Sequence, residues 1–92
     1  MEFEWAPEKA ARNLQKHRVA FGEATSVFGD PLSNTAPDPD HSHSESRYII
    51  IGMSSRGRML MVAYADRHGR IRLISARTLT RKEKRDYGEI NK

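Results

Sequence analysis

Arg47-Tyr48-Ile49-Ile50-Ile51-Gly52-Met53 is the stretch that decides the fold of this 92-residue chain. Its β-branched and aromatic residues are typical of a strand, and its apolar centre predicts burial on both faces. A hairpin turn at Ser54–Gly57 follows, so the next apolar run, Arg58–Ala65, folds back as an antiparallel neighbour. A second turn at Asp66–Gly69, whose glycine supplies a positive φ, leads into a third strand at Arg70–Arg77.

The third strand of this meander alternates in its first half. Because strand side chains point to opposite faces in turn, Ile71, Leu73 and Ser75 are expected on one face. The other face is expected to carry Arg70, Arg72, Ile74 and Ala76.

Two helices are predicted before the meander, at Pro7–His17 and Phe21–Phe28. The apolar side of the first is read as Ala10, Leu14 and His17, with Ala11 beside them. The stripe of the second is Phe21, Ala24, Val27 and Phe28. Both helices begin after an alanine, Ala6 or Ala20, which cannot accept a hydrogen bond from the first turn and forfeits about 1 kcal/mol.

Shorter elements complete the chain. Phe3–Trp5 and Leu32–Thr35 are expected as short strands, the second at a sheet edge in the loop-rich stretch Pro31–Ser46. Thr80 with Glu83 fits a capping box that opens a terminal helix. The fold class is therefore α+β: a small antiparallel sheet with the two N-terminal helices on one face and a short C-terminal helix, in one domain over residues 1–92.

The charge of the chain is unevenly distributed. Its 16 Lys and Arg exceed its 12 Asp and Glu by four, and residues 1–55 carry −3 whereas residues 56–92 carry +7. The basic C-terminal part is the expected surface for a polyanion, although a solvated surface has the same composition. Absence of cysteine excludes disulfides, thiol nucleophiles and thiolate metal sites and suits a cytoplasmic location. The longest apolar run, Met59–Ala65, is far shorter than the ~20 residues that span a bilayer.

Arginine is the residue type that points most directly to chemistry. It binds phosphate in a two-pronged manner and stays charged, and its positions mark strand ends and turns: Arg47, Arg58, Arg67, Arg70, Arg72 and Arg77. Rings able to stack on bases are Tyr48, Tyr64 and Tyr87. His17 ends the first predicted helix, where it either contacts phosphate or packs on a core edge. The pair His41 and His43 suggests metal ligation, but no distant motif completes a site and a solvated loop is favoured.

These residues suit RNA cleavage without a cofactor or metal. The 2′-hydroxyl of RNA is an internal nucleophile, so a protein needs only to orient it and to stabilise the charge on phosphorus. Arg, Lys, His and Tyr are sufficient for that task.

The sequence also resembles a known family over essentially its whole length. The resemblance in the first half rests on Phe3–Ala10, Asn13, Lys16-His17, Val19–Ala24 and Val27–Leu32. In the second half it rests on His41-Ser42, Glu45–Arg47, Ile51-Gly52, Gly57-Arg58, Tyr64, Arg67, Ile71–Arg77 and Thr80–Glu83. The chain is similar to BrnT toxins, the ribonucleases of bacterial type II toxin–antitoxin pairs.

The resemblance implies a RelE-like fold, neutralisation by a BrnA antitoxin, and promoter DNA binding only as the toxin–antitoxin complex. The chain departs from the family pattern at three places: Ala6 replaces Asp, Arg18 replaces Gly, and Ala20–Glu23 replaces Ser-Phe-Glu-Glu. By analogy with RelE-like toxins, Arg47, Arg77 and Tyr87 are counterparts of the residues that contact RNA.

The expected function is that of an mRNA-cleaving toxin that arrests translation. Its candidate catalytic residues are Arg77, Arg47, His17 and Glu23. Its candidate RNA-binding residues are Arg67, Arg70, Arg72, Tyr64, Lys16 and Tyr87. The alternative is a non-catalytic module that binds nucleic acid or an antitoxin and has lost toxicity.

Overall fold

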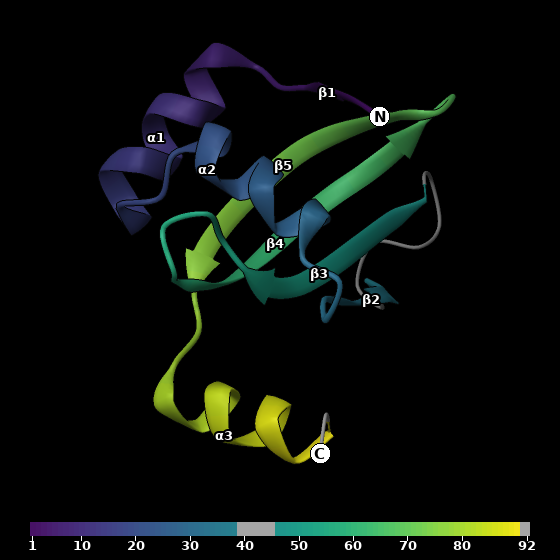
Figure 1. Cartoon of the computed structure of the whole chain (residues 1–92). Coiled ribbons are helices and arrows are strands. Elements are labelled where there is room, and N and C mark those ends of the chain that lie inside the picture. Colours follow the sequence, from purple (N-terminus) through teal and green to yellow (C-terminus); the bar gives the residue numbers. More distant parts are fainter. Residues whose placement is uncertain (39–45, 91–92) are drawn as a thin grey trace.

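The computed structural model describes residues 1–38 and 46–90 of the chain (Figure 1). The elements in chain order are β1 (Glu2–Glu4), α1 (Pro7–His17), α2 (Phe21–Thr25), the 3-10 turn η1 (Ser26–Gly29), β2 (Asn34–Pro37), β3 (Arg47–Met53), β4 (Met59–Arg67), β5 (Arg70–Thr78) and α3 (Arg81–Ile90). This order confirms the α+β class. The two shortest strands are each displaced by one or two residues from their expected positions.

The strands form one five-stranded sheet in the order β1-β5-β4-β3-β2. The meander β3-β4-β5 is antiparallel as predicted, and β2 adds to it antiparallel. β1 instead runs parallel to β5, with Glu2 opposite Arg70, so the sheet is mixed rather than antiparallel throughout. Short hairpins fix the direction of consecutive strands only, and β1 is joined to the other strands through two helices.

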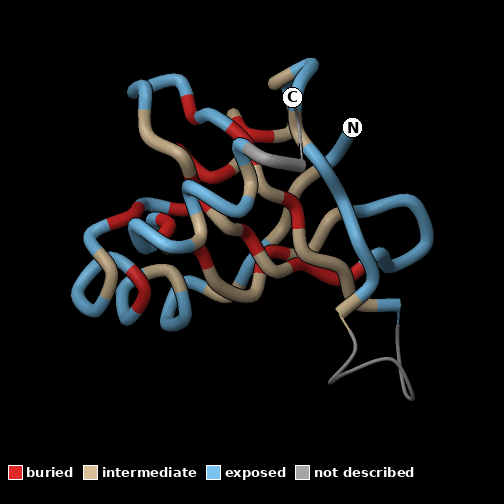
Figure 2. Tube along the Cα trace, turned by 90° about the horizontal axis from the view of Figure 1, so that it is seen from below, coloured by how far each residue is buried: buried red, intermediate tan, exposed pale blue. Residues whose placement is uncertain are grey.

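α1, α2 and η1 cover one face of the sheet (Figure 1). In that view α3 lies below the end of the sheet where β3 and β4 are joined. The core lies between these layers and is the buried centre of Figure 2. Its helical side contributes Val19, Phe21, Ala24 and Val27, and its sheet side contributes Ile50, Leu60, Val62, Tyr64, Leu73 and Ala76. The expected stripe of the second helix is thus confirmed, although the α-helix ends at Thr25 and η1 continues it.

The expected inner side of α1 is correct for Ala10, which packs against the core, but wrong for Leu14. Leu14 is 50% exposed, whereas Asn13 is 6% exposed and faces the sheet. The Asn13 side chain accepts a hydrogen bond from the Ala76 amide at 3.0 Å and donates to the Ala76 carbonyl at 2.8 Å. β1 pairs with β5 only as far as Arg72. Beyond that point Asn13 makes the hydrogen bonds to the β5 backbone that a neighbouring strand would otherwise make. A polar contact therefore sets the rotation of α1.

Two strand predictions also need correction. β3 is not buried on both faces, because Ile50 points into the core while Ile49 and Ile51 are half-buried on the opposite, open face of the sheet. In β5 the alternation of side chains breaks at Ile74. Ser75 is opposite Ala63 and Leu73 is opposite Tyr64, so Ile74 is an extra residue with no counterpart on β4. This bulge turns Ala76 into the core instead of away from it.

The helix ends agree with the sequence. Neither Ala6 nor Ala20 makes a side-chain cap. The capping box of α3 is confirmed, because the Glu83 amide donates to Thr80 Oγ1 at 3.1 Å and the Thr80 amide donates to Glu83 Oε1 at 2.9 Å. α1 ends at Arg18 in the left-handed region, with φ 59°.

Candidate nucleic-acid interface

A basic groove lies between α1 and β5. It encloses about 310 Å³ and is lined by Lys9, Arg12, Asn13, Lys16, His17, Ile74 and Ser75. Lys9 is followed after three or four residues by Arg12 and Asn13, and these are followed after the same interval by Lys16 and His17, which brings all five to one side of α1. Two predicted site residues, Lys16 and His17, are therefore placed together, and Lys9 and Arg12 join them.

The cations of the basic groove carry uncompensated charge. Within residues 1–38 and 46–90, no carboxylate forms an ion pair with Lys9, Arg12 or Lys16. All three are exposed. A concave site with three free cations favours an anionic ligand.

Asn13 forms the floor of the basic groove and ties α1 to two neighbouring segments. Besides its two bonds to Ala76, its amide donates to the Val19 carbonyl at 2.9 Å. Both amide protons are thus used. The cationic side of α1 is thereby held in a fixed register against β5.

Arg70 and Arg72 are compensated within the chain, unlike the groove cations. Arg72 Nη1 lies 2.9 Å from Glu4 Oε2, and Arg70 Nε lies 3.1 Å from Glu2 Oε2. Parallel pairing of β1 with β5 places these carboxylates opposite the arginines. A phosphate would have to displace them.

Arg77 is also paired, and it lies near the C-terminal end of β5 on the open face of the sheet. Its guanidinium binds Glu83 with both arms, at 2.8 and 2.9 Å. This contact raises the pKa of Arg77 and lowers that of Glu83 to about 2. Arg77 follows Ser75 by two residues on the open face of the sheet, where its Nη2 lies 3.3 Å from Met61 Sδ of β4, so it does not line the basic groove.

Arg47 and Arg77 are not brought together by the structure. Arg47 starts β3 opposite Ala65 of β4. Arg77 lies opposite Met61 of β4, which in turn lies opposite Ile51 of β3. Four residues of strand separate these positions, about 13 Å. Arg67 lies at the same end as Arg47, opposite Arg70. A single phosphate gripped by Arg47 and Arg77 together is therefore not favoured by this arrangement.

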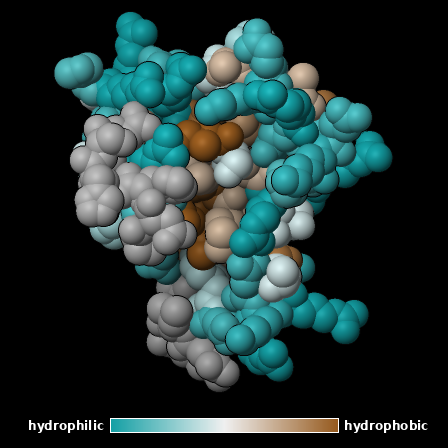
Figure 3. Space-filling model, turned by 180° about the vertical axis from the view of Figure 1, so that it is seen from behind, coloured by the Kyte–Doolittle hydropathy of each residue, from teal (hydrophilic) through white to brown (hydrophobic). Residues whose placement is uncertain are grey.

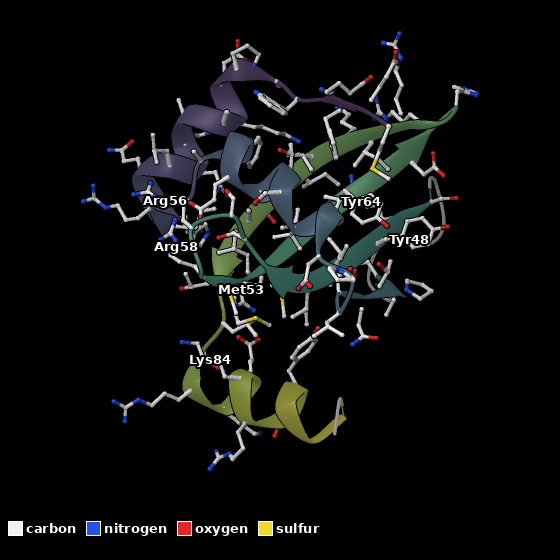
Figure 4. The ribbon with its side chains drawn as sticks, in the orientation of Figure 1. Tyr48, Met53, Arg56, Arg58, Tyr64 and Lys84 are labelled. Atoms are coloured by element: carbon white, nitrogen blue, oxygen red, sulfur yellow. The ribbon has the colours of Figure 1, made fainter. Side chains whose placement is uncertain are left out.

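Glu23 forms a buried tie rather than an open acid–base group. It pairs with Arg58 Nη2 through Oε1, and its Oε2 accepts from Arg58 Nε at 3.0 Å and from Ser54 Oγ at 2.7 Å. The Arg58 hydrogen bond is the main reason that the pKa of Glu23 is lowered. Arg58 also donates to the Arg18 carbonyl at 3.0 Å, so the tie fastens α1 and α2 to the β3–β4 hairpin, where Figure 4 labels Arg56 and Arg58.

Tyr64 and Tyr87 are both engaged within the fold. The Tyr64 ring is 8% exposed, stacks on Tyr48 at 5.5 Å and meets Phe28 edge-on at 5.0 Å. Burial raises the pKa of Tyr64, and the ring offers no free face to a base. The Tyr87 hydroxyl bonds to the Leu32 carbonyl at 2.8 Å, so it holds α3 to the loop before β2.

The open face of the sheet carries an apolar groove of about 370 Å³ beside β2. It is lined by Asn34, Thr35, Ala36, Pro37, Ile49, Ile51, Met61 and Tyr87. Figure 3 shows an apolar patch surrounded by hydrophilic side chains on the side turned away from α1 and α2. This groove lies at the opposite edge of the sheet from the basic groove.

Among the residues that the structure describes, neither a group of metal ligands nor a membrane-spanning helix contributes to this site. His41 and His43 fall outside the described residues. Among residues 1–38 and 46–90 no three His, Cys, Asp or Glu side chains gather as metal ligands. No helix in that part of the chain is long and apolar enough to cross a membrane.

Sequence reasoning missed Lys9, Arg12 and Ser75. The helix period places Lys9, Arg12 and Lys16 on one side, and that signal was present. Net charge does not reveal it, because the excess of cations lies in residues 56–92, and hydrophobicity alone predicts that Leu14 faces inward where the structure has Asn13.

The fold and the basic groove define a class: a small α+β protein with a cationic groove between its first helix and its sheet. The family model described as the ribonuclease toxin BrnT of type II toxin–antitoxin systems matches residues 5–83. The chain belongs to this BrnT family, as the resemblance implied.

A solved structure supports the fold. The crystal structure of the Brucella abortus ribonuclease toxin BrnT superimposes with a TM-score of 0.70, covers 88% of this chain and 99% of its own, and shares 18% sequence identity. No curated protein sequence matches the chain significantly.

Proposed function

We propose that the chain is a toxin that arrests translation by cutting mRNA in the cytoplasm without a metal ion. The observation that carries this proposal is the basic groove, which combines three uncompensated cations with one imidazole. Membership of a ribonuclease toxin family supports it. A non-catalytic binding module would need the cations but not His17.

The chemistry follows from the groove residues. Lys9, Arg12 and Lys16 hold the RNA backbone, and the His17 imidazole accepts the proton of a 2′-hydroxyl. The 2′-oxygen attacks the adjacent phosphorus, the bond from phosphorus to the 5′-oxygen breaks, and the leaving oxygen takes a proton from water. The products are a 2′,3′-cyclic phosphate and a 5′-hydroxyl.

Charge develops on the phosphate oxygens as this bond forms. Lys16 lines the groove, and Arg77 contributes once its guanidinium exchanges Glu83 for phosphate. Preorganised cations of this kind supply much of the rate enhancement in such reactions. The remaining catalytic candidates, Arg47 and Glu23, stay predictions. So do the RNA-binding candidates Arg67, Arg70, Arg72, Tyr64 and Tyr87.

The partner of this toxin is an antitoxin of the BrnA kind, which we expect to be acidic where it meets the cations. Type II membership implies a protein antitoxin. Acidic residues would make association fast by electrostatic steering, and apolar contacts would slow release. Promoter binding is proposed for the complex alone.

A cleavage assay tests the proposal. Purified wild-type protein in a buffer with EDTA, with and without ribosomes, should cut single-stranded RNA and leave cyclic phosphate ends. His17→Ala should lose cleavage, whereas Arg85→Ala, which removes an exposed cation from α3, should retain it. Intact RNA under both conditions would contradict the proposal.

A further inference from the structure

We infer that the basic groove takes the backbone of single-stranded nucleic acid and does not read its bases. The inference deepens the proposed function, on which it rests for the RNA substrate. Four features of the groove carry it: its size, its row of cations, the state of Asn13, and the bulge at Ile74.

The row of cations matches one strand. Lys9 and Lys16 lie seven residues apart on α1, which is about 10 Å along the helix axis. Arg12 lies between them on the same side. A single line of three charges serves up to three phosphates of one strand.

The enclosed volume also favours one strand. About 310 Å³ between a helix and a strand edge leaves room for a stretch of backbone and not for a double helix. Double-stranded RNA is recognised through contacts that span two minor grooves and the phosphates between them. A single row at a sheet edge does not provide such a surface.

Asn13 is the groove residue suited to read adenine, and its side chain is already used. Asparagine reads adenine by donating and accepting at the same time. Here both donor protons go to the Val19 and Ala76 carbonyls, and the amide oxygen accepts from the Ala76 amide. Asn13 therefore positions α1 instead of selecting a base.

The bulge at Ile74 adds a contact surface that does not distinguish one base of the nucleic acid from another. It lets Ile74 line the groove beside Ser75. An aliphatic side chain contacts a sugar or a base face without distinguishing bases. Of the two β5 side chains that line the groove, that of Ser75 carries a polar group.

The experiment uses fluorescent 2′-O-methyl oligonucleotides, which lack the nucleophile and so cannot be cut. Anisotropy titrations compare oligo(U), oligo(A) and a blunt duplex of the same length between about 50 and about 200 mM salt. The test variant is Lys9→Ala with Lys16→Ala. Its matched control is Lys82→Ala with Lys84→Ala, which removes two exposed lysines from α3, where Figure 4 labels Lys84.

We expect the two single strands to bind within about threefold of each other. Three phosphate contacts predict a slope of log affinity against log salt of about −2, and loss of two lysines should bring it to about −0.7. The α3 control should keep the wild-type slope for single strands. Duplex affinity should be the same for the groove variant and the wild type.

Two results would overturn the inference. One is a difference of tenfold or more between oligo(U) and oligo(A), and the other is an equal loss of duplex and single-strand affinity in the groove variant. Because these probes report binding alone, groove-dependent binding by a protein that leaves RNA intact would contradict the proposed function and not this inference.

Discussion

Arg77 and Glu83 form a two-armed ion pair that joins the end of β5 to the first turn of α3, with Nη1 2.8 Å from Oε1 and Nη2 2.9 Å from Oε2. Glu83 also accepts from the Thr80 amide, so one carboxylate both caps the helix and binds the sheet. The same guanidinium lies 3.3 Å from Met61 Sδ of β4. The position of α3 and the availability of Arg77 are thereby coupled.

The first prediction concerns pH. The folded-state pKa of Glu83 is about 2, below its ordinary 4.5, so its stabilising contribution is complete above pH 4.5 and is lost as pH falls toward 2. Both side chains are partly exposed, which limits the contribution to about 1 kcal/mol. Urea unfolding of wild type and Glu83→Gln should differ by this amount at pH 7, and the difference should disappear only as pH falls through about 2. A difference that does not change with pH would exclude the ion pair as its source.

The second prediction concerns Arg77 itself. Arg77→Ala should lower RNA cleavage by about 100-fold, the typical effect of removing one preorganised donor to the reacting phosphate. Arg77→Lys should restore only part of it, because an ammonium cannot form the two-armed contact. Circular dichroism should show an intact fold in both variants. Full activity in folded Arg77→Ala protein would remove Arg77 from the site.

The third prediction concerns the end of α1. Arg18 adopts φ 59°, a conformation that costs a residue with a side chain about 1 kcal/mol more than glycine. Arg18→Gly should therefore raise the free energy of unfolding by about 0.5 kcal/mol after the greater chain entropy of glycine is deducted. This substitution keeps the backbone carbonyl at position 18, which accepts a hydrogen bond from Arg58. Thermal unfolding at matched pH measures the change, and a lower melting temperature would argue against strain at this residue.

The fourth prediction concerns the antitoxin. We expect it to compete with RNA and to raise the melting temperature of the toxin, because a ligand that binds only the folded state stabilises it by mass action. The measurement pairs melting curves with an RNA competition assay, both with the product of the neighbouring gene. Simultaneous binding of both ligands would instead indicate that the antitoxin uses a separate surface, such as the apolar groove beside β2.

Most of the fold was predictable from short-range patterns. The strand Arg47–Met53, the helix Pro7–His17 and the capping box of Thr80 with Glu83 all depend on neighbours within a few residues, and the structure has them at these positions. The direction of β1 was not predictable, because it depends on pairing with β5 about 68 positions further along the chain.

The candidate site was predictable only in part. Lys16 and His17 were named from the sequence, and they line the basic groove. The inward turn of Asn13 depends on a strand edge that β1 leaves uncovered, and the displacement of Ala76 depends on a bulge. Neither feature has a local sequence signal. The ion pairs of Arg70, Arg72 and Arg77 likewise join residues that only the folded chain brings together.

The central claim is that the basic groove cuts mRNA. Its most direct test is induced expression of the chain without its antitoxin in bacterial cells, with growth and mRNA integrity followed together. We expect growth arrest with fragmented mRNA for wild type and for Arg85→Ala, and normal growth with intact mRNA for His17→Ala at equal protein level. Growth arrest and fragmentation in His17→Ala equal to the wild type, or arrest of wild-type cells with intact mRNA, would contradict it.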